Sequence, residues 1–448
     1  MTPPNAAAPA GAAGPRPPVT RRRVCRRAFA GGAAAAVLST AACAAFGSRV
    51  PPPSSERVTL EYWDAQAGGP IITPIIQRFQ ERQPRFTVNV TSLSQDESLD
   101  KFRAAFAAAT APDLWKSTLV YNADFAARRS SANLEPFVAG VKNDLLPLAL
   151  EEGRRYKNTL YNLPAELDVY LQYYHGGLFA RAGLKPPETF EQLVQVGQQL
   201  LRQSTPESPV WAITITGARG GHFPSLTACA AWNGPGAGNG LFDDKGTCLL
   251  TTPAAIAGYQ FWGDLLRRHQ IAPAPGTAGV SIAAGTLATQ WGFLGAIAGL
   301  DRNPGADNYG STKPPAGPKG RLVPWGANGW MMSSATKHPG DVWLLLSYLF
   351  SPEINGEWGQ ARGAMPTNAK AYSQSWLQRP VYAAAADLLH APKELLLLPT
   401  WLSAWSTFVT EIAVAANTRF LAGEITAQQA TQEMATFLTD AQRQYLAS

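Results

Sequence analysis

Histidine and cysteine are scarce in this chain, whose 448 residues include five of the first and four of the second. No two cysteines have the C-x-x-C spacing of zinc and redox sites, and no H-E-x-x-H metalloprotease motif is present. The sequence also lacks the G-x-S-x-G nucleophile elbow and the G-K-S/T end of a phosphate loop. We therefore expect no metal, no cofactor and no catalytic residues.

The apolar run from Ala28 to Ala42 is shorter than the roughly 20 residues that a membrane-spanning helix needs. It follows Arg21–Arg23 and Arg26–Arg27 and ends at Cys43, which is the layout of a signal peptide. Residues 1–43 are therefore predicted to be a leader that is removed after export. Arg26–Arg27 resembles the twin-arginine export signal, and ordinary secretion remains an alternative.

The leader ends in Thr40-Ala-Ala-Cys43, which resembles a lipoprotein processing box. In such a box the cysteine thiol is acylated and becomes the new N-terminus. Residues 44–56 are rich in proline and serine and are predicted to be a tether behind that anchor. We expect an exported protein at the outer face of the cytoplasmic membrane or in the periplasm, held by lipid alone. The alternative is cleavage nearby, with Cys43 incidental.

Basic residues are in excess only because of the leader, which holds six arginines and no acidic residue. Without it the formal charge falls from +6 to zero, since 32 basic then face 32 acidic residues. A neutral protein has no field that would recruit nucleic acid or an anionic membrane. A small-molecule ligand is the better expectation.

Only Cys229 and Cys248 remain once the leader and its end are set aside. In an oxidising compartment two cysteines are expected to form one disulfide. Two buried free thiols are the alternative.

The exported part begins with a strand-like alternation at Val58–Trp63, helical spacing over Ile71–Phe79 and a second strand at Phe86–Val90. This order predicts a βαβ unit with parallel strands, hence an α/β fold. Further along, Val210–Ile215 has the pattern of a strand. Helix starts are predicted at the Thr189/Gln192 capping pair, at Thr252-Pro253 and at Thr426. The length favours two domains, and no repeat of 20 to 50 residues occurs.

The order of segments resembles the extracellular solute-binding protein family 1, the maltose-binding-like receptors of ABC importers. The resemblance spans nearly all of residues 58–446. It is carried by these stretches: Val58–Asp64, Lys101–Asp113, Leu160–Tyr174, Leu178–Leu184, Trp325–Ser333 and Arg362–Pro366.

The resemblance implies a two-lobed periplasmic-binding-protein fold of type II, with two α/β lobes joined by two or three crossing segments. The first lobe is then 57–167 with a return at 327–366, and the second is 168–326 with C-terminal helices at 367–448. The crossings are placed near 165–169, 325–328 and 364–368. The resemblance further implies a monomer without catalysis that delivers its ligand to ABC permease subunits.

A sugar site needs aromatic platforms for C–H faces and short polar side chains for hydroxyl groups. Glu166 is preferred for the cleft and Asp168 for the hinge, since only one of the two carboxylates is expected to face the ligand. His222 is interpreted as a surface residue, and Trp262 and Trp343 as core residues. The candidate ligand-binding residues are Trp63, Asp64, Glu166, Trp232, Asn233, Trp291, Trp325, Asn328, Arg362 and Trp405.

Two other functions remain open from the sequence. A glycoside hydrolase would use two of Glu166, Asp168 and Asp64 as its acid and base, although nothing in their spacing shows opposed carboxylates. A sensory or adhesive surface protein would use the same binding fold to present a sugar to another partner. For any single tryptophan, core packing is as good an interpretation as ligand contact.

Overall fold

The computed structural model describes residues 50–448, apart from 67, 206, 236–239 and 304–307. The predicted leader, with Cys43, and residues 44–49 of the predicted tether lie outside the described residues. The described part of the tether packs against the rest of the chain. The Ser54 amide donates to the Asp341 carboxylate at 3.1 Å, and Arg85 donates to the same oxygen at 2.7 Å.

The fold begins with the predicted βαβ unit. Strand β1 (Val58–Asp64) pairs in parallel with β2 (Phe86–Ser92) and with β3 (Leu114–Ser117), and α1 (Gly69–Arg82) connects the first two. Helix α1 buries Ile72, Ile75, Ile76 and Phe79, the spacing expected of a helix with one face on a sheet. The parallel α/β prediction is confirmed here.

Two long strands, β4 (Leu163–His175) and β7 (Val323–Met332), continue the sheet as an antiparallel pair. Among the described residues the strand order is β2-β1-β3-β7-β4-β5, and β6, β8 and β9 pair beside this path. Strand β4 pairs with β7 up to Val169 and then, from Tyr170, with β5 and β6. The change of partner joins the two halves of the sheet. The remaining bounds are β5 Thr289–Phe293, β6 Tyr309–Thr312, β8 Met365–Pro366 and β9 Leu395–Leu396.

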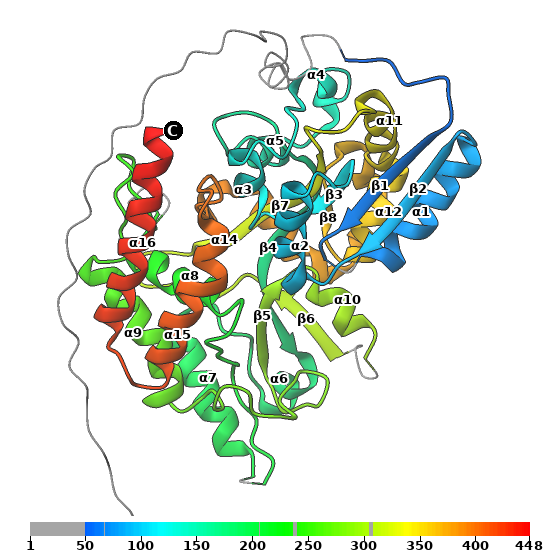
Figure 1. Ribbon diagram of the computed structural model, residues 1–448. Helices are drawn as coiled ribbons and strands as arrows, with labels where there is room; N and C mark the ends of the chain where they lie inside the picture. Colours follow the sequence, from blue (N-terminus) through cyan, green and yellow to red (C-terminus); the bar gives the residue numbers. More distant parts are fainter. Residues whose placement is uncertain (1–49, 67, 206, 236–239, 304–307) are drawn as a thin grey trace, which may run out of the picture. The chain divides into compact units, whose positions relative to one another are not determined.

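Helices pack around both ends of this sheet. Helices α1, α11 and α12 lie beside β1 and β2, whereas α8, α9, α15 and α16 pack with one another (Figure 1). The helices not yet given are α2 Gln95–Ala107, α3 Asn122–Ala127, α4 Glu135–Val138, α5 Pro147–Gly153, α6 Gly176–Ala182, α7 Phe190–Gln203, α8 His222–Asn233, α9 Pro253–Arg267, α10 Ala296–Asp301, α11 Pro339–Leu349, α12 Pro352–Arg362, α13 Ala383–His390, α14 Trp405–Thr407, α15 Ala413–Leu421 and α16 Ala427–Ala447. A π-helix, Phe408–Ile412, lies between α14 and α15.

The predicted helix starts are present. Thr189 accepts from the Gln192 amide at 3.1 Å, and Thr252 accepts from the Ala255 amide with Pro253 in the first turn. Thr426 and Gln429 form a capping box at α16. These local signals need no tertiary partner, which is why the sequence predicts them well. The strand expected at Val210–Ile215 is wrong, because only an isolated bridge from Trp211 to Leu287 forms there.

Helices α8 and α9 approach each other closely. A side chain at Gly258 of α9 would meet the Ala228 carbonyl oxygen at 2.5 Å, so only glycine fits at this crossing. Cys229 lies in the same buried face, and Cys248 follows the turn at Gly246. Both are buried free thiols in this structure, which is the alternative that the sequence leaves open. Each fills a small apolar space, as buried free cysteines commonly do. In the part of the chain described, no helix is both long and apolar enough to cross a membrane.

Candidate functional site

A pocket of about 430 Å³ lies where segments from both halves of the sheet meet. Its walls come from the loops after β1 and β3, from strands β4 and β7, from the start of α8, and from the segment after β5. This volume is in the range of small-molecule sites. The lining residues are Gln66, Gln95, Thr118, Leu119, Val120, Asp168, Arg219, Gly220, His222, Phe223, Phe293, Gly295, Ala296, Asn328 and Val409.

A larger cavity, of about 870 Å³, lies beside α16. Its lining includes Asp244, Trp401 and the exposed Leu446. None of its described lining residues belongs to strands β1 to β7, although Leu322 directly precedes β7. We favour the smaller pocket as the candidate site. Polar side chains from α2, β4, β7 and the start of α8 converge there.

Asn328 of β7 fixes one wall of the pocket. Its side-chain oxygen accepts from the Leu119 amide at 2.9 Å, and this holds the loop that supplies Thr118, Leu119 and Val120. The side chain is 5% exposed and lines the pocket itself. Among the ten residues predicted from the sequence, Asn328 is the one that lines this pocket.

Asp168 lines the pocket from β4. The Leu294 amide donates to its carboxylate at 2.7 Å. Burial raises the pKa of Asp168 to about 7, with a contribution from Glu166, while the Leu294 hydrogen bond, Arg362 and Lys116 oppose the shift. Near neutral pH, therefore, this carboxyl group is divided between its two protonation states.

Glu166 lies two residues before Asp168 on β4 and is 1% exposed. It accepts from Lys116 at 2.8 Å and from the indole nitrogen of Trp358 at 2.6 Å. Burial lowers the pKa of Lys116, while Glu166 opposes that shift. The two carboxylates have different surroundings, and their places are the reverse of those predicted from the sequence. Asp168 is at the pocket and Glu166 is in a buried ion pair.

Asp64 and Arg362 act behind the pocket wall. The Asp64 carboxylate is fully buried and accepts from the Gln66 and Gly68 amides at 2.9 and 2.8 Å, which shapes the loop into α1. Arg362 donates to the Gln66 side-chain oxygen at 3.1 Å, and Lys116 donates to it at 2.9 Å. Neither Asp64 nor Arg362 lines the pocket. Together they hold Gln66, which does.

His222 and Arg219 enter from the start of α8. His222 is 2% exposed rather than on the surface as predicted, and it lines the pocket. Neither ring nitrogen has a hydrogen-bond partner among the described residues. Burial, with help from Arg219, lowers the pKa of His222 to about 3, so the ring is neutral. Arg219 donates to the hydroxyl group of Tyr121, which precedes α3.

Two phenylalanines supply the aromatic surface of the pocket. Phe223 and Phe293 meet edge to face with centroids 4.8 Å apart, and Tyr170 packs on Phe293 at 5.0 Å. Sequence reasoning missed both, because phenylalanine at a helix start or strand end reads as core. The glycines at 220 and 221, ahead of a helix N-terminus, are the signal that marks this segment.

The predicted tryptophans pack into the protein. Trp291 is 8% exposed, donates to Gln172 at 3.1 Å, and lies 5.5 Å from Trp262 and 5.6 Å from Phe190. Trp63 packs on Phe102 at 5.3 Å.

Trp232, Asn233, Trp325 and Trp405 are likewise occupied by the protein. Trp232 packs on Phe261 at 5.0 Å, and Asn233 donates to the Gly240 carbonyl at 2.9 Å. Trp325 and Trp405 are 4% and 1% exposed. None of these tryptophans lines the pocket, so its platforms differ from those predicted.

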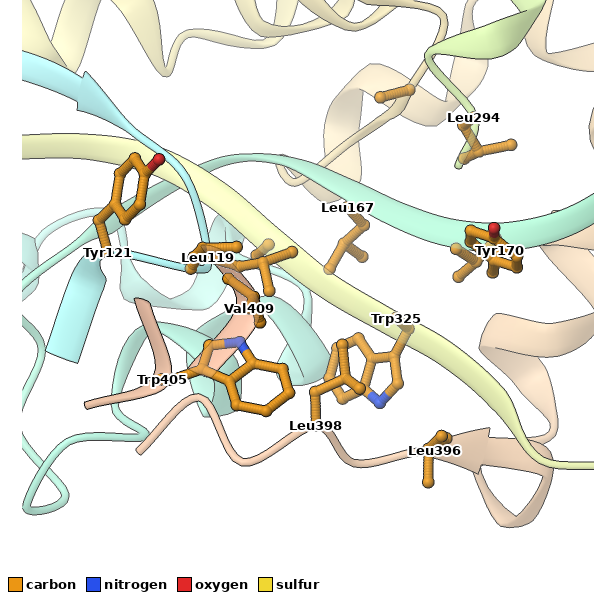
Figure 2. Packing of buried hydrophobic residues seen from close by; sticks show 14 of the residues in the cluster. Leu119, Tyr121, Leu167, Tyr170, Leu294, Trp325, Leu396, Leu398, Trp405 and Val409 are labelled. Atoms are coloured by element: carbon orange, nitrogen blue, oxygen red, sulfur yellow. The ribbon is translucent and has the colours of Figure 1, made fainter. Parts of the chain in front are cut away.

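The π-helix brings Val409 to the pocket. Trp405 stacks on Phe408 at 4.9 Å and also contacts the ring of His222 at 6.2 Å. Figure 2 shows Trp405 and Val409 gathered with Leu119 and Trp325, which come from distant parts of the chain. Single π-helical turns inside helices are frequent at functional sites. Here the turn closes the apolar side of the pocket.

The chemistry of the lining suits a neutral or weakly charged polar ligand with an apolar face. Amide, hydroxyl and imidazole groups can direct hydrogen bonds, and the two phenyl rings can cover C–H surfaces. Glycoside hydrolysis needs an acid and a base on either side of one bond. Among the described lining residues Asp168 is the only carboxylate, because Glu166 and Asp64 lie behind the wall.

This chain belongs to the bacterial extracellular solute-binding proteins, whose family profile matches residues 74–385. A binding protein of Brucella abortus (strain 2308) is 21% identical over 370 residues, covering 77% of this chain and 84% of that one. The family resemblance noted from the sequence is thereby confirmed.

Solved structures share the fold. The GacH receptor of Streptomyces glaucescens superposes with a TM-score of 0.72 at 20% identity, covering 87% of this chain and 98% of that one. MalE3 of T. maritima gives 0.73 at 19% identity, with 85% and 98% covered. UgpB of Mycobacterium tuberculosis gives 0.73 at 19% identity, with 87% and 99% covered. The predicted periplasmic-binding-protein fold of type II is confirmed.

Proposed function

We propose that this protein is the substrate-binding receptor of an ABC importer and that it captures a sugar or a related polar solute in the Asp168 pocket. One observation carries the proposal. Side chains from several different strands and helices converge on one pocket of about 430 Å³. Such convergence is expected of a receptor that closes on its ligand.

The ligands of proteins with the same fold support a polar solute. The GacH receptor was crystallised with acarbose, MalE3 with maltose and UgpB with glycerophosphocholine. The pocket of the present chain has the hydrogen-bonding groups and the phenyl surfaces that a hydroxylated ligand requires. Among the described lining residues Asp168 is the one carboxylate, and this favours binding over glycoside hydrolysis.

The two lobes remain as predicted from the sequence, 57–167 with 327–366 and 168–326 with 367–448. The partner change of β4 between Val169 and Tyr170 supports a crossing in that region. A ligand that contacts both lobes stabilises the closed arrangement over the open one, and this difference in affinity drives closure.

Export and delivery complete the proposal. The protein is exported, acylated at Cys43, and active as a monomer that delivers its ligand to permease subunits. Changing Cys43 to serine should release it from the membrane fraction. A mature N-terminus beyond Cys43 in the unmodified protein would contradict lipidation.

The test of the receptor function is a thermal-shift screen against mono- and disaccharides, polyols and glycerophosphodiesters. A ligand that binds only the folded state raises the melting temperature. At a hundredfold excess over Kd it adds about 2.7 kcal/mol to the free energy of unfolding. We expect at least one compound to stabilise the protein and to be recovered intact. Hydrolysis of a bound sugar, or no shift with any compound, would contradict the proposal.

A further inference from the structure

We propose that the ligand carries a protonated amine beside its hydroxyl groups, as an amino sugar does, and that Asp168 is the counter-ion of that amine. The inference rests on the proposed receptor function and names the class of solute that the same pocket selects.

Five charged groups gather behind the pocket wall. The cluster at the junction of β1, β3 and β4 holds two cations, Lys116 and Arg362, and three carboxylates, Asp64, Glu166 and Asp168. Among these five groups one negative charge is in excess when all are ionised; Arg219 of the pocket lies outside this cluster and donates to Tyr121. A buried charge without a partner is costly, so an excess of this kind invites a cation from outside.

The excess negative charge of this cluster lies on Asp168. Glu166 is paired with Lys116 at 2.8 Å, and Asp64 accepts from two backbone amides and from the Tyr62 hydroxyl group. Asp168 accepts only the Leu294 amide and makes no ion pair with any described residue. It is also the member of the cluster that lines the pocket. The unpaired carboxylate therefore faces the ligand.

Aromatic rings and a neutral histidine surround the expected position of the amine. Phe223 and Phe293 line the same pocket, and the faces of aromatic rings attract cations. His222 is neutral and does not repel a cation. The pocket's own cation, Arg219, donates to the Tyr121 hydroxyl group. A charge-assisted hydrogen bond from an ammonium group is about twice as strong as one from a sugar hydroxyl group.

The pairing gives binding a defined pH dependence. The groups that act on Asp168 are Glu166 on its own strand, Lys116 from β3, Arg362 from α12 and the Leu294 amide after β5. Burial raises the pKa of Asp168 to about 7, so the free protein loses the counter-ion below that pH. An amine that binds only the ionised form should bind about 100-fold more weakly at pH 5 than at pH 8.

The experiment compares sugars that differ in one group. Calorimetry at pH 7.5 uses three pairs: glucose with glucosamine, galactose with galactosamine, and mannose with mannosamine. N-acetylglucosamine serves as an uncharged control. We expect at least one amine to bind 10-fold or more tightly than its hydroxyl twin. Asp168→Asn should remove that preference, whereas Asp244→Asn, an exposed carboxylate beside the other cavity, should keep it.

The outcomes separate this inference from the receptor function. If the neutral sugar binds as tightly as its amine in every pair, the counter-ion role of Asp168 is wrong and the receptor function stands. If no sugar of either series binds, the amine inference is wrong, whereas the receptor function is decided by the wider thermal-shift screen. If the amine preference survives Asp168→Asn in a protein that melts normally, the amine is held elsewhere and the assignment is overturned.

Discussion

Asp168 and Glu166 lie two residues apart on β4, and their different surroundings give them different roles. Glu166 is enclosed with Lys116 and Trp358, whereas Asp168 has one backbone donor and an open side toward the pocket. The sequence places both side chains on the same face of the strand, because the side-chain period of a strand is two. It does not say which face meets the pocket, since that depends on where β3 and α12 pack.

The raised pKa of Asp168 predicts how stability depends on pH. The group titrates at 3.8 in its ordinary state and at about 7 in the folded protein. The folded state thus binds the proton more tightly, and this stabilisation is present below pH 3.8 and lost as the pH rises through 7. Asp168→Asn removes this dependence. The change that it causes in the free energy of unfolding should therefore be more favourable at pH 8 than at pH 4, by up to about 4 kcal/mol. Urea denaturation of both proteins at the two pH values measures this, and an effect independent of pH would contradict it.

In the Lys116–Glu166 pair, the stability lost on replacing one residue should depend strongly on whether the other is present. Both side chains are buried, so Lys116→Met leaves an uncompensated carboxylate and should cost about 3 to 5 kcal/mol of stability. Adding Glu166→Gln should recover part of that loss, because no buried charge then remains. Denaturant titration of the single and double variants tests this. Additive losses would show that the two charges do not compensate each other.

At the scale of elements, local signals are predicted well and contacts between elements are not. The caps at Thr189, Thr252 and Thr426 depend on neighbouring backbone amides and are present. The alternation at Val210–Ile215 lacks a partner strand, because Trp211 makes only a single bridge to Leu287. A strand forms only when a partner strand supplies hydrogen bonds along its length, and the sequence of the segment alone does not show whether such a partner is present.

Strand β5 shows the same limit for the tryptophans. Trp291 was a candidate platform, yet α7 and α9 bring Phe190 and Trp262 against it. Trp291→Ala should therefore lower the free energy of unfolding by about 3 to 5 kcal/mol through the cavity it leaves, with little change in ligand affinity. Thermal melts and calorimetry separate the two effects. A variant that melts normally but no longer binds would return Trp291 to the site.

At the scale of the whole molecule, the order of segments was enough to indicate the family and the fold. The pocket was not predictable in the same way, because it depends on pairs far apart in the sequence. Asn328 holds the Leu119 loop across 209 residues, and the π-helix adds Val409 from near the C-terminus. Of the candidate ligand residues, Asn328 lines the pocket, while Asp168, His222 and the two phenylalanines emerged only from the fold.

The central claim is that ligand binds between segments from both halves of the sheet in the Asp168 pocket. Calorimetry with a compound identified by the thermal screen tests it on three variants: Gln95→Ala from α2, Phe293→Ala from β5, and Trp401→Ala from the cavity beside α16. We predict that the first two each weaken binding by about 1 to 3 kcal/mol, the range for contacts at the centre of a site, and that the third binds normally. Loss of binding in Trp401→Ala, with normal binding in the other two, would contradict the account.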